Sequence, residues 1–266
     1  MATHRLPWAG RARTPSVGSP TPAAEDRELT LVEHLEELRR ALIIVLIAWG
    51  LTTTLAFIFN HDVIAILERP LHLALLHTKS PFEQDVVVTS PIAGLSIPFE
   101  VSGVAGLIMA LPVVVWQVWS FIAPGLRRTE RRLAFPFVAG TLFFFALGGL
   151  FAYFVLPIGL TFLATFLGSN AIYLPDLGAY LSFLALVVLI FGVTFEMPVV
   201  LCLLGAIGIL SSQQLRRWRK VSIFVIVLAA LVVTPGADPF TPTFLSAALI
   251  IFYEGSILFI RHVLHR

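Results

Sequence analysis

The sequence predicts an all-α integral membrane protein with six transmembrane helices. Of its 266 residues, 58% are hydrophobic and only 13% are charged, and the mean hydropathy is +0.91. Soluble domains carry about 25% charged residues, so the bilayer is the expected solvent for most of this chain. A spanning helix needs about 20 apolar residues. The chain therefore has room for six spans with short connections and for no large domain outside the membrane.

The N-terminal residues differ from the rest. Residues 1–28 are rich in Pro, Gly, Ser and Arg and are expected to form a disordered tail. The membrane domain is expected at 29–262, and a short tail at 263–266. In residues 29–40, leucines recur at helical spacing beside acidic residues, which predicts an amphipathic helix that runs into the first span without a break.

Six apolar runs predict the spans. The first is expected at about 41–60, and a polar loop with several prolines then reaches about residue 96. The other spans are expected at about 98–122, 133–156, 180–210, 221–233 and 243–260. The last two are short for a bilayer, so we expect this part of the molecule to thin the membrane locally or to pack against neighbours.

The basic residues indicate the orientation. They cluster before the first span, in alternate connections and after the last span, and only Arg69 and Lys79 fall on the opposite side. By the positive-inside rule, both termini are cytoplasmic. This topology accounts for the pI near 9.0, so a nucleic-acid partner is not needed.

Catalytic chemistry has little support in the sequence. All seven histidines lie outside the predicted spans or at their ends, and the single cysteine, Cys202, lies in an apolar run. Walker, dinucleotide and zinc-protease motifs are absent. We therefore expect no enzyme activity, no catalytic residue, no metal site and no cofactor, and an intramembrane enzyme is the third interpretation of the chain.

Two carboxylates occupy unusual places in or near the spans. Glu196 lies halfway along the fourth span, where a charge costs a few kcal/mol, and Pro198 is expected to break the helix there. Glu196 is either a protonated group satisfied within its bundle or a polar site in a cavity or groove. Asp238, between the last two spans, is either a solvated loop residue or a functional one.

Two more carboxylates flank the cytoplasmic boundary. Glu37 precedes the first span, and Glu130 lies among four arginines after the second. A charge run at a membrane edge is usually a solvated anchor. The alternative is that both carboxylates face one ligand and accept forked hydrogen bonds from its guanidinium groups. Paired arginines of a peptide would suit such a site.

Five motifs match one known family in order. They are HLEELR at 34–39, QVWSFIAPGL at 117–126 followed by ERR at 130–132, FAYF at 151–154, FGVTFEMPV at 191–199, and Thr234-Pro235 with Asp238. Together they resemble the signatures of the TatC family across residues 31–254.

The resemblance implies a concave, glove-like bundle of six helices in the cytoplasmic (inner) membrane of a prokaryote. Such proteins bind twin-arginine signal peptides of folded proteins, assemble with TatA- and TatB-type single-span proteins and with further copies of themselves, and use the protonmotive force. The last two spans are the expected edge for the single-span partners. By motif position, the implied signal-peptide-binding residues are Glu37, Glu130, Arg39, Phe121, Pro124 and Leu126, the membrane-embedded polar residue is Glu196, and the outer-loop or partner contacts are Pro70, Thr234 and Asp238.

The chain also departs from the family pattern. Residues 90–95 lack the Glu and Phe of the motif SPTExF, Glu100 stands where relatives often carry Lys, and Pro242 stands where Gln is common. These changes bear on the partner contacts. The alternative function is a proton-coupled small-molecule transporter, because a glutamate beside a proline break is also typical of transporter sites.

Overall fold

The computed structural model describes residues 31–76, 86–122, 134–166, 175–236 and 238–264. Within these ranges the chain forms helices and no strand, apart from one isolated bridge between Val87 and Asp176. The all-α prediction is therefore confirmed. The expected tail at 1–28 and the last two residues lie outside the described ranges.

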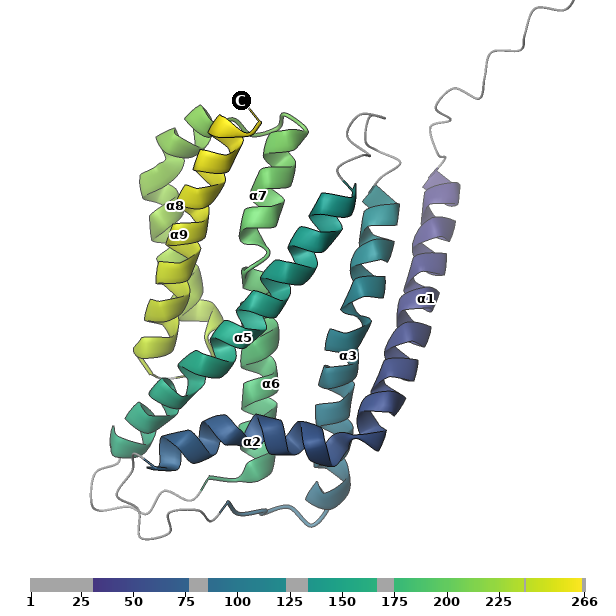
Figure 1. Cartoon of the computed structure of the whole chain (residues 1–266), viewed down its shortest axis with the longest axis vertical. Coiled ribbons are helices and arrows are strands. Elements are labelled where there is room, and N and C mark those ends of the chain that lie inside the picture. Colours follow the sequence, from purple (N-terminus) through teal and green to yellow (C-terminus); the bar gives the residue numbers. More distant parts are fainter. Residues whose placement is uncertain (1–30, 77–85, 123–133, 167–174, 237, 265–266) are drawn as a thin grey trace, which may run out of the picture.

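The described chain folds into eight helices. They are α1 (Leu31–Ile58), α2 (Asn60–Leu76), α3 (Ala93–Ile122), α5 (Ala134–Phe166), α6 (Leu177–Thr194), α7 (Met197–Ala206), α8 (Ser212–Val233) and α9 (Phe240–His262). Helices α1 and α3 stand side by side, α5 crosses the molecule diagonally, and α7, α8 and α9 form a group on the other side (Figure 1). Helix α2 lies across one end of the bundle.

The two ends of the bundle differ in charge. The end that holds the start of α1 and the end of α9 (Figure 1) carries most of the described arginines and lysines, and we call it the basic end. The opposite end, which we call the α2 end, holds α2 and the turn between α8 and α9. Both ends of the described chain therefore lie on the same side.

Five segments of the described chain are long and apolar enough to cross a membrane: 34–58, 93–121, 135–166, 177–206 and 240–262. Helix α8 is not among them. It has 22 residues, but its first turns carry Arg216, Arg217, Arg219 and Lys220, and the apolar remainder spans only about 20 Å at 1.5 Å per residue. Since the hydrocarbon core is about 30 Å thick, the count of six spans stays a prediction.

Helix α2 is a correction to the predicted loop. The sequence predicts a polar connection over residues 61–96, whereas residues 60–76 form a helix with Pro70 inside it. Its buried face is Pro70, Leu71, Ala74 and Leu75. Proline and scattered charges favour a loop in the sequence. Burial against α5, α3 and α6 nevertheless stabilises the helix.

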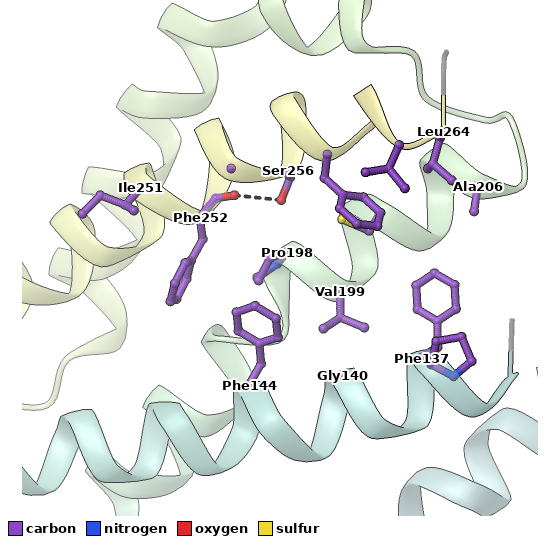
Figure 2. A pocket seen from close by; sticks show the side chains of 15 residues that line it. Phe137, Gly140, Phe144, Pro198, Val199, Ala206, Ile251, Phe252, Ser256 and Leu264 are labelled. Atoms are coloured by element: carbon purple, nitrogen blue, oxygen red, sulfur yellow. Dashed lines mark hydrogen bonds between the residues drawn. The ribbon is translucent and has the colours of Figure 1, made fainter. Parts of the chain in front are cut away.

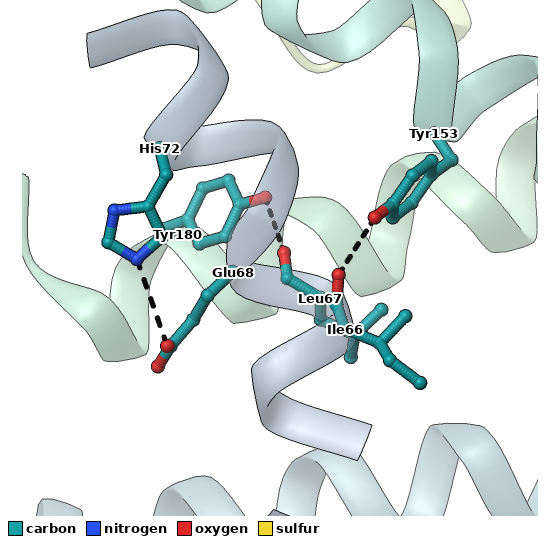
Figure 3. Close-up of polar contacts among 6 residues, drawn as sticks. All are labelled: Ile66, Leu67, Glu68, His72, Tyr153 and Tyr180. Carbon is teal, nitrogen blue, oxygen red and sulfur yellow. Dashed lines mark hydrogen bonds and ion pairs between the residues drawn. The ribbon is translucent and has the colours of Figure 1, made fainter. Parts of the chain in front are cut away.

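Pro70 leaves one backbone carbonyl of α2 without its helical hydrogen bond, and side chains from other helices supply donors in this region. Proline has no N–H, so the carbonyl of Ile66, four residues earlier, loses its helical donor. The Tyr153 hydroxyl donates to this oxygen at 2.9 Å, and the Tyr180 hydroxyl donates to the next carbonyl, that of Leu67, at 2.8 Å. Figure 3 shows both tyrosines reaching α2 from α5 and α6.

The other helix boundaries differ from prediction at a few places. Helix α1 is continuous, as expected, and α6 and α7 are separate helices at the predicted proline break. Helix α5 continues past residue 156 to Phe166, with Pro157 inside it. Helix α8 begins before its apolar run, because Ser211 and Gln214 form a capping box at its start.

Helices α1 and α3 approach each other closely at one glycine. A Cβ on Gly106 would lie 2.6 Å from the backbone of Thr53. Nearby, the Trp49 indole donates to the Gly103 carbonyl at 2.8 Å, and the Thr52 hydroxyl donates to the Gly106 carbonyl at 2.7 Å. Small residues and interhelical hydrogen bonds are the usual basis of helix association in lipid, so α1 and α3 form one rigid pair.

Candidate functional site

A polar cavity opens between α1 and α3 at the basic end. Its volume is about 330 Å³, and we call it the α1–α3 cavity; it is lined by Glu37, Arg40, Ala41, Ile44, Gln117, Ser120 and Phe121. These residues recur at spacings of three, four and seven on α1 and of three and four on α3, which places them on one face of each helix. The cavity therefore joins the HLEELR motif to the motif at 117–126. Glu37 and Phe121, both expected to bind a signal peptide, are brought together here.

His34 completes this arrangement. Its imidazole stacks on the Phe121 ring, with 4.1 Å between centroids and 21° between planes. Its Nδ1 atom lies 3.8 Å from Oε2 of Glu37. The same side chain thus lies between the two predicted residues and contacts both of them.

Sequence reasoning missed three residues of the cavity lining, and His34 beside it, as site candidates. His34, Arg40, Gln117 and Ser120 were not named, although all but Arg40 belong to the quoted motifs or lie inside them. Helical spacing is the signal that could have found them: His34 and Arg40 lie three residues from Glu37, Gln117 lies four before Phe121, and Ser120 lies three after Gln117.

The cavity is built for a cationic or polar ligand at the membrane edge. The Glu37 side chain is 45% exposed, so its carboxylate can accept hydrogen bonds from an incoming group. Gln117 and Ser120 add neutral donors and acceptors, and Phe121 offers a ring face on which a guanidinium group can stack. Arg40 also lines the cavity, so the formal charges of Glu37 and Arg40 cancel in the lining.

The other predicted signal-peptide residues fall elsewhere. Arg39 is exposed on α1 and is not part of the cavity lining. Pro124, Leu126 and Glu130 lie outside the described residues.

Glu196 is a polar residue that does not line the α1–α3 cavity. It lies at the break between α6 and α7, where Pro198 leaves the Thr194 carbonyl without its helical donor. The half-buried carboxyl faces Thr141 and the backbone of Phe145 on α5. Its Oε1 atom is buried and has no hydrogen-bond partner among the described residues.

The residues predicted as outer-loop or partner contacts lie at the α2 end and hold the fold there. Pro70 is buried in α2, and the buried Thr234 hydroxyl donates to the Ala230 carbonyl at 2.7 Å. Asp238 is only 4% exposed. Its carboxylate accepts from the backbone N–H of Thr241 at 2.7 Å and from the Thr241 hydroxyl at 2.8 Å. The alternative that Asp238 is a solvated loop residue is therefore wrong.

The described residues show no candidate metal site. The described residues contain no group of three His, Cys, Asp or Glu side chains that could hold an ion.

Comparison with known proteins identifies the family. A family model described as "Sec-independent protein translocase protein (TatC)" matches residues 33–247. The chain belongs to the TatC family. Among its relatives, TatC of Frankia casuarinae is 35% identical over 90% of this chain and 67% of the relative. TatC of Aquifex aeolicus is 37% identical over 86% of this chain and 93% of the relative.

Solved structures agree with the family. A crystal structure described as the twin-arginine translocase receptor TatC has a TM-score of 0.70 and 35% identity, and the match covers 88% of this chain and all of that one. A second TatC crystal structure, in the detergent DDM, gives a TM-score of 0.70 and 37% identity over 85% of this chain and 98% of that one. This TatC protein is thus a multi-pass protein of a bacterial membrane and a subunit of the protein translocase, and the transporter alternative gains no support.

Proposed function

We propose that this TatC protein is the receptor that binds twin-arginine signal peptides of folded proteins, and that the α1–α3 cavity receives the arginines. The observation that carries this proposal is the meeting of Glu37 and Phe121 in one cavity, although they come from motifs far apart in the sequence. The cavity lies at the basic end, which faces the cytoplasm under the positive-inside rule. A precursor made in the cytoplasm would therefore meet it directly.

The chemistry of the cavity favours arginine over lysine. A carboxylate can accept two parallel N–H bonds from one guanidinium group, and each such charge-assisted bond contributes about 1.5–3 kcal/mol. An ammonium group cannot form this fork. Glu37 supplies one carboxylate, and Glu130, which follows α3 in the sequence, is the proposed second one.

The apolar surface of α8 supports an assembly with single-span helices. Helix α8 packs mainly on α9, and large side chains such as Phe224, Leu228 and Leu231 are more than 45% exposed. TatA- and TatB-type proteins, and further copies of this chain, are the proposed partners. The protonmotive force is the proposed energy source, and the subunit itself is proposed to have no enzyme activity.

Replacing Glu37 by Gln tests this function. The change removes the negative charge and one acceptor of the fork, so the affinity for a twin-arginine peptide should fall by about 10-fold to 150-fold, which corresponds to about 1.5–3 kcal/mol. Glu130→Gln should have the same effect. Affinity is measured with the purified, folded protein and a labelled signal peptide.

Glu36→Gln is the matched control. Glu36 is exposed on the same turn of α1 but does not line the cavity, so its replacement should leave the affinity nearly unchanged. Equal affinities of the Glu37→Gln and Glu130→Gln variants and the original protein would refute the assignment of the site.

A further inference from the structure

Two cavities of the described chain differ in the charge of their linings. The larger one has a volume of about 520 Å³ and lies between α5, α7 and α9, where Phe144, Pro198 and Phe252 are among its lining residues (Figure 2). No charged side chain lines it. The α1–α3 cavity is lined by Glu37 and Arg40, and an imidazole lies beside it. Charge can therefore control binding in the α1–α3 cavity.

His34 already makes the two contacts that the α1–α3 cavity offers to an arginine. Its ring stacks on Phe121, with 4.1 Å between centroids, and its Nδ1 atom lies 3.8 Å from Oε2 of Glu37. A guanidinium group that stacks on this face of Phe121 and bonds to Glu37 must take the place of the imidazole. The His34 side chain is 42% exposed, so it has room to turn away into solvent.

A protonated imidazole resembles a guanidinium group. Both are planar cations whose N–H groups can donate to a carboxylate, and a cation is attracted to the face of an aromatic ring. A neutral imidazole lacks this charge and is held less strongly beside Phe121 and Glu37. Histidine side chains change charge between about pH 5 and 8. Competition between His34 and an incoming arginine should therefore depend on pH in this range.

The other groups around the cavity do not supply a second histidine. Glu37 and Arg40, both on α1, are the charged residues of its lining. Arg40 keeps its charge, because a guanidinium group is not deprotonated in proteins. Helix α3 contributes Gln117, Ser120 and Phe121 to the lining, and none of these side chains carries a charge. Among the described residues, His34 is thus the histidine through which pH can act on the empty cavity.

We propose that His34 is an internal competitor of the signal peptide. Its protonated imidazole occupies the position between Phe121 and Glu37 and must leave before an arginine can bind there. This inference rests on the proposed function of the α1–α3 cavity. Because proton binding to His34 opposes peptide binding, the affinity for a twin-arginine peptide should rise as the pH rises and the imidazole loses its proton.

The affinity of the purified full chain for a labelled twin-arginine peptide without histidine tests this proposal. The affinity should be about 3-fold to 10-fold weaker at about pH 6 than at about pH 8, as expected for the loss of one exposed cation–π contact and one exposed ion pair. His34→Gln removes the cation. This variant should bind the peptide equally well at both pH values.

A permanent cation at the same position gives the opposite result. His34→Arg places a guanidinium group beside Glu37 at every pH, so this variant should bind the peptide weakly at both pH values. His72→Gln is the matched control. His72 lies 4.0 Å from Glu68 on α2, at the other end of the molecule (Figure 3), and its replacement should leave the original pH dependence in place.

Proton release gives a readout that needs no variant. If the peptide displaces a protonated His34, binding near neutral pH should release a fraction of a proton. Calorimetric titrations of the original protein in buffers of different ionisation enthalpy measure this release. Absence of proton release would overturn the proposal.

The Glu37→Gln variant separates this proposal from the proposed function. If Glu37→Gln weakens binding at the higher pH while the original protein and His34→Gln show the same pH dependence, the competitor role of His34 is wrong and the arginine site stands. If Glu37→Gln leaves the affinity unchanged at the higher pH, both the arginine site and the competitor role are wrong.

Discussion

Pro70 removes one backbone hydrogen bond from α2, and the Tyr153 hydroxyl replaces it at the Ile66 carbonyl. Because this hydrogen bond is exposed, Tyr153→Phe should destabilise the protein by about 0.5–1.5 kcal/mol, the usual net contribution of an intramolecular hydrogen bond. Alanine at position 70 restores a backbone N–H that can bond to the same carbonyl. The cost of Tyr153→Phe should then shrink in a Pro70→Ala background.

Thermal unfolding of the four proteins of this double-mutant cycle, in one detergent, gives the coupling between the two positions. If Tyr153→Phe lowered the stability equally with Pro70 and with Ala at position 70, the Tyr153 hydroxyl would not be the replacement donor for the Ile66 carbonyl.

Asp176 ties the segment before α3 to the start of α6. Its carboxylate accepts hydrogen bonds from the backbone N–H of Ala179, which caps α6, and from the hydroxyl and N–H of Thr89. These bonds, that from Ala179 first, lower the pKa of Asp176 below its ordinary value. A lowered folded-state pKa means that the carboxylate stabilises the fold above its unfolded pKa of about 3.9.

This contribution should be lost as the pH falls through the lowered pKa of Asp176. Asp176→Asn should make the protein less stable at neutral pH and should flatten the loss of stability between about pH 5 and the acid limit of folding. Melting temperatures of the two proteins across this range test the prediction, and parallel curves would contradict it.

At the scale of the helices, Gly106 sets the contact between α1 and α3. Gly106→Ala would force a Cβ to within 2.6 Å of the Thr53 backbone, and such overpacking typically costs about 1–3 kcal/mol. Gly103→Ala, three residues earlier on α3, would place its Cβ in open space. The first variant should lower the melting temperature, whereas the second should leave it unchanged or raise it slightly; the reverse order would contradict this packing.

The helices also show which features can be read from the sequence. The break at Glu196 and Pro198 and the continuous α1 were predicted, because proline chemistry and helical periodicity act over a few residues. Helix α2 was missed, because it is stabilised by burial against α5, α3 and α6 and by hydrogen bonds from tyrosines on α5 and α6. The contact of His34 with Phe121 was missed for the same reason, since it joins two helices.

At the scale of the whole molecule, both ends of the described chain lie at the basic end (Figure 1). From the positive-inside rule we expect this end to face the cytoplasm. In a Cys202→Ser background, a cysteine at Val263 should react with a membrane-impermeant maleimide only in opened cells. A cysteine at His61, at the α2 end, should also react in intact cells. Labelling of Val263→Cys in intact cells would contradict this orientation.

The most direct test of the central claim is photocrosslinking of a twin-arginine precursor from Ser120, which lines the α1–α3 cavity without being a predicted arginine ligand. The control position is Leu35, which is 65% exposed and lies on the other face of α1. If the α1–α3 cavity receives the arginines, Ser120 should crosslink to the precursor and Leu35 should not. The crosslinks from Ser120 should be lost when the two arginines are replaced by lysines. Crosslinks from Ser120 that persist with the lysine precursor, or that are matched at Leu35, would contradict it.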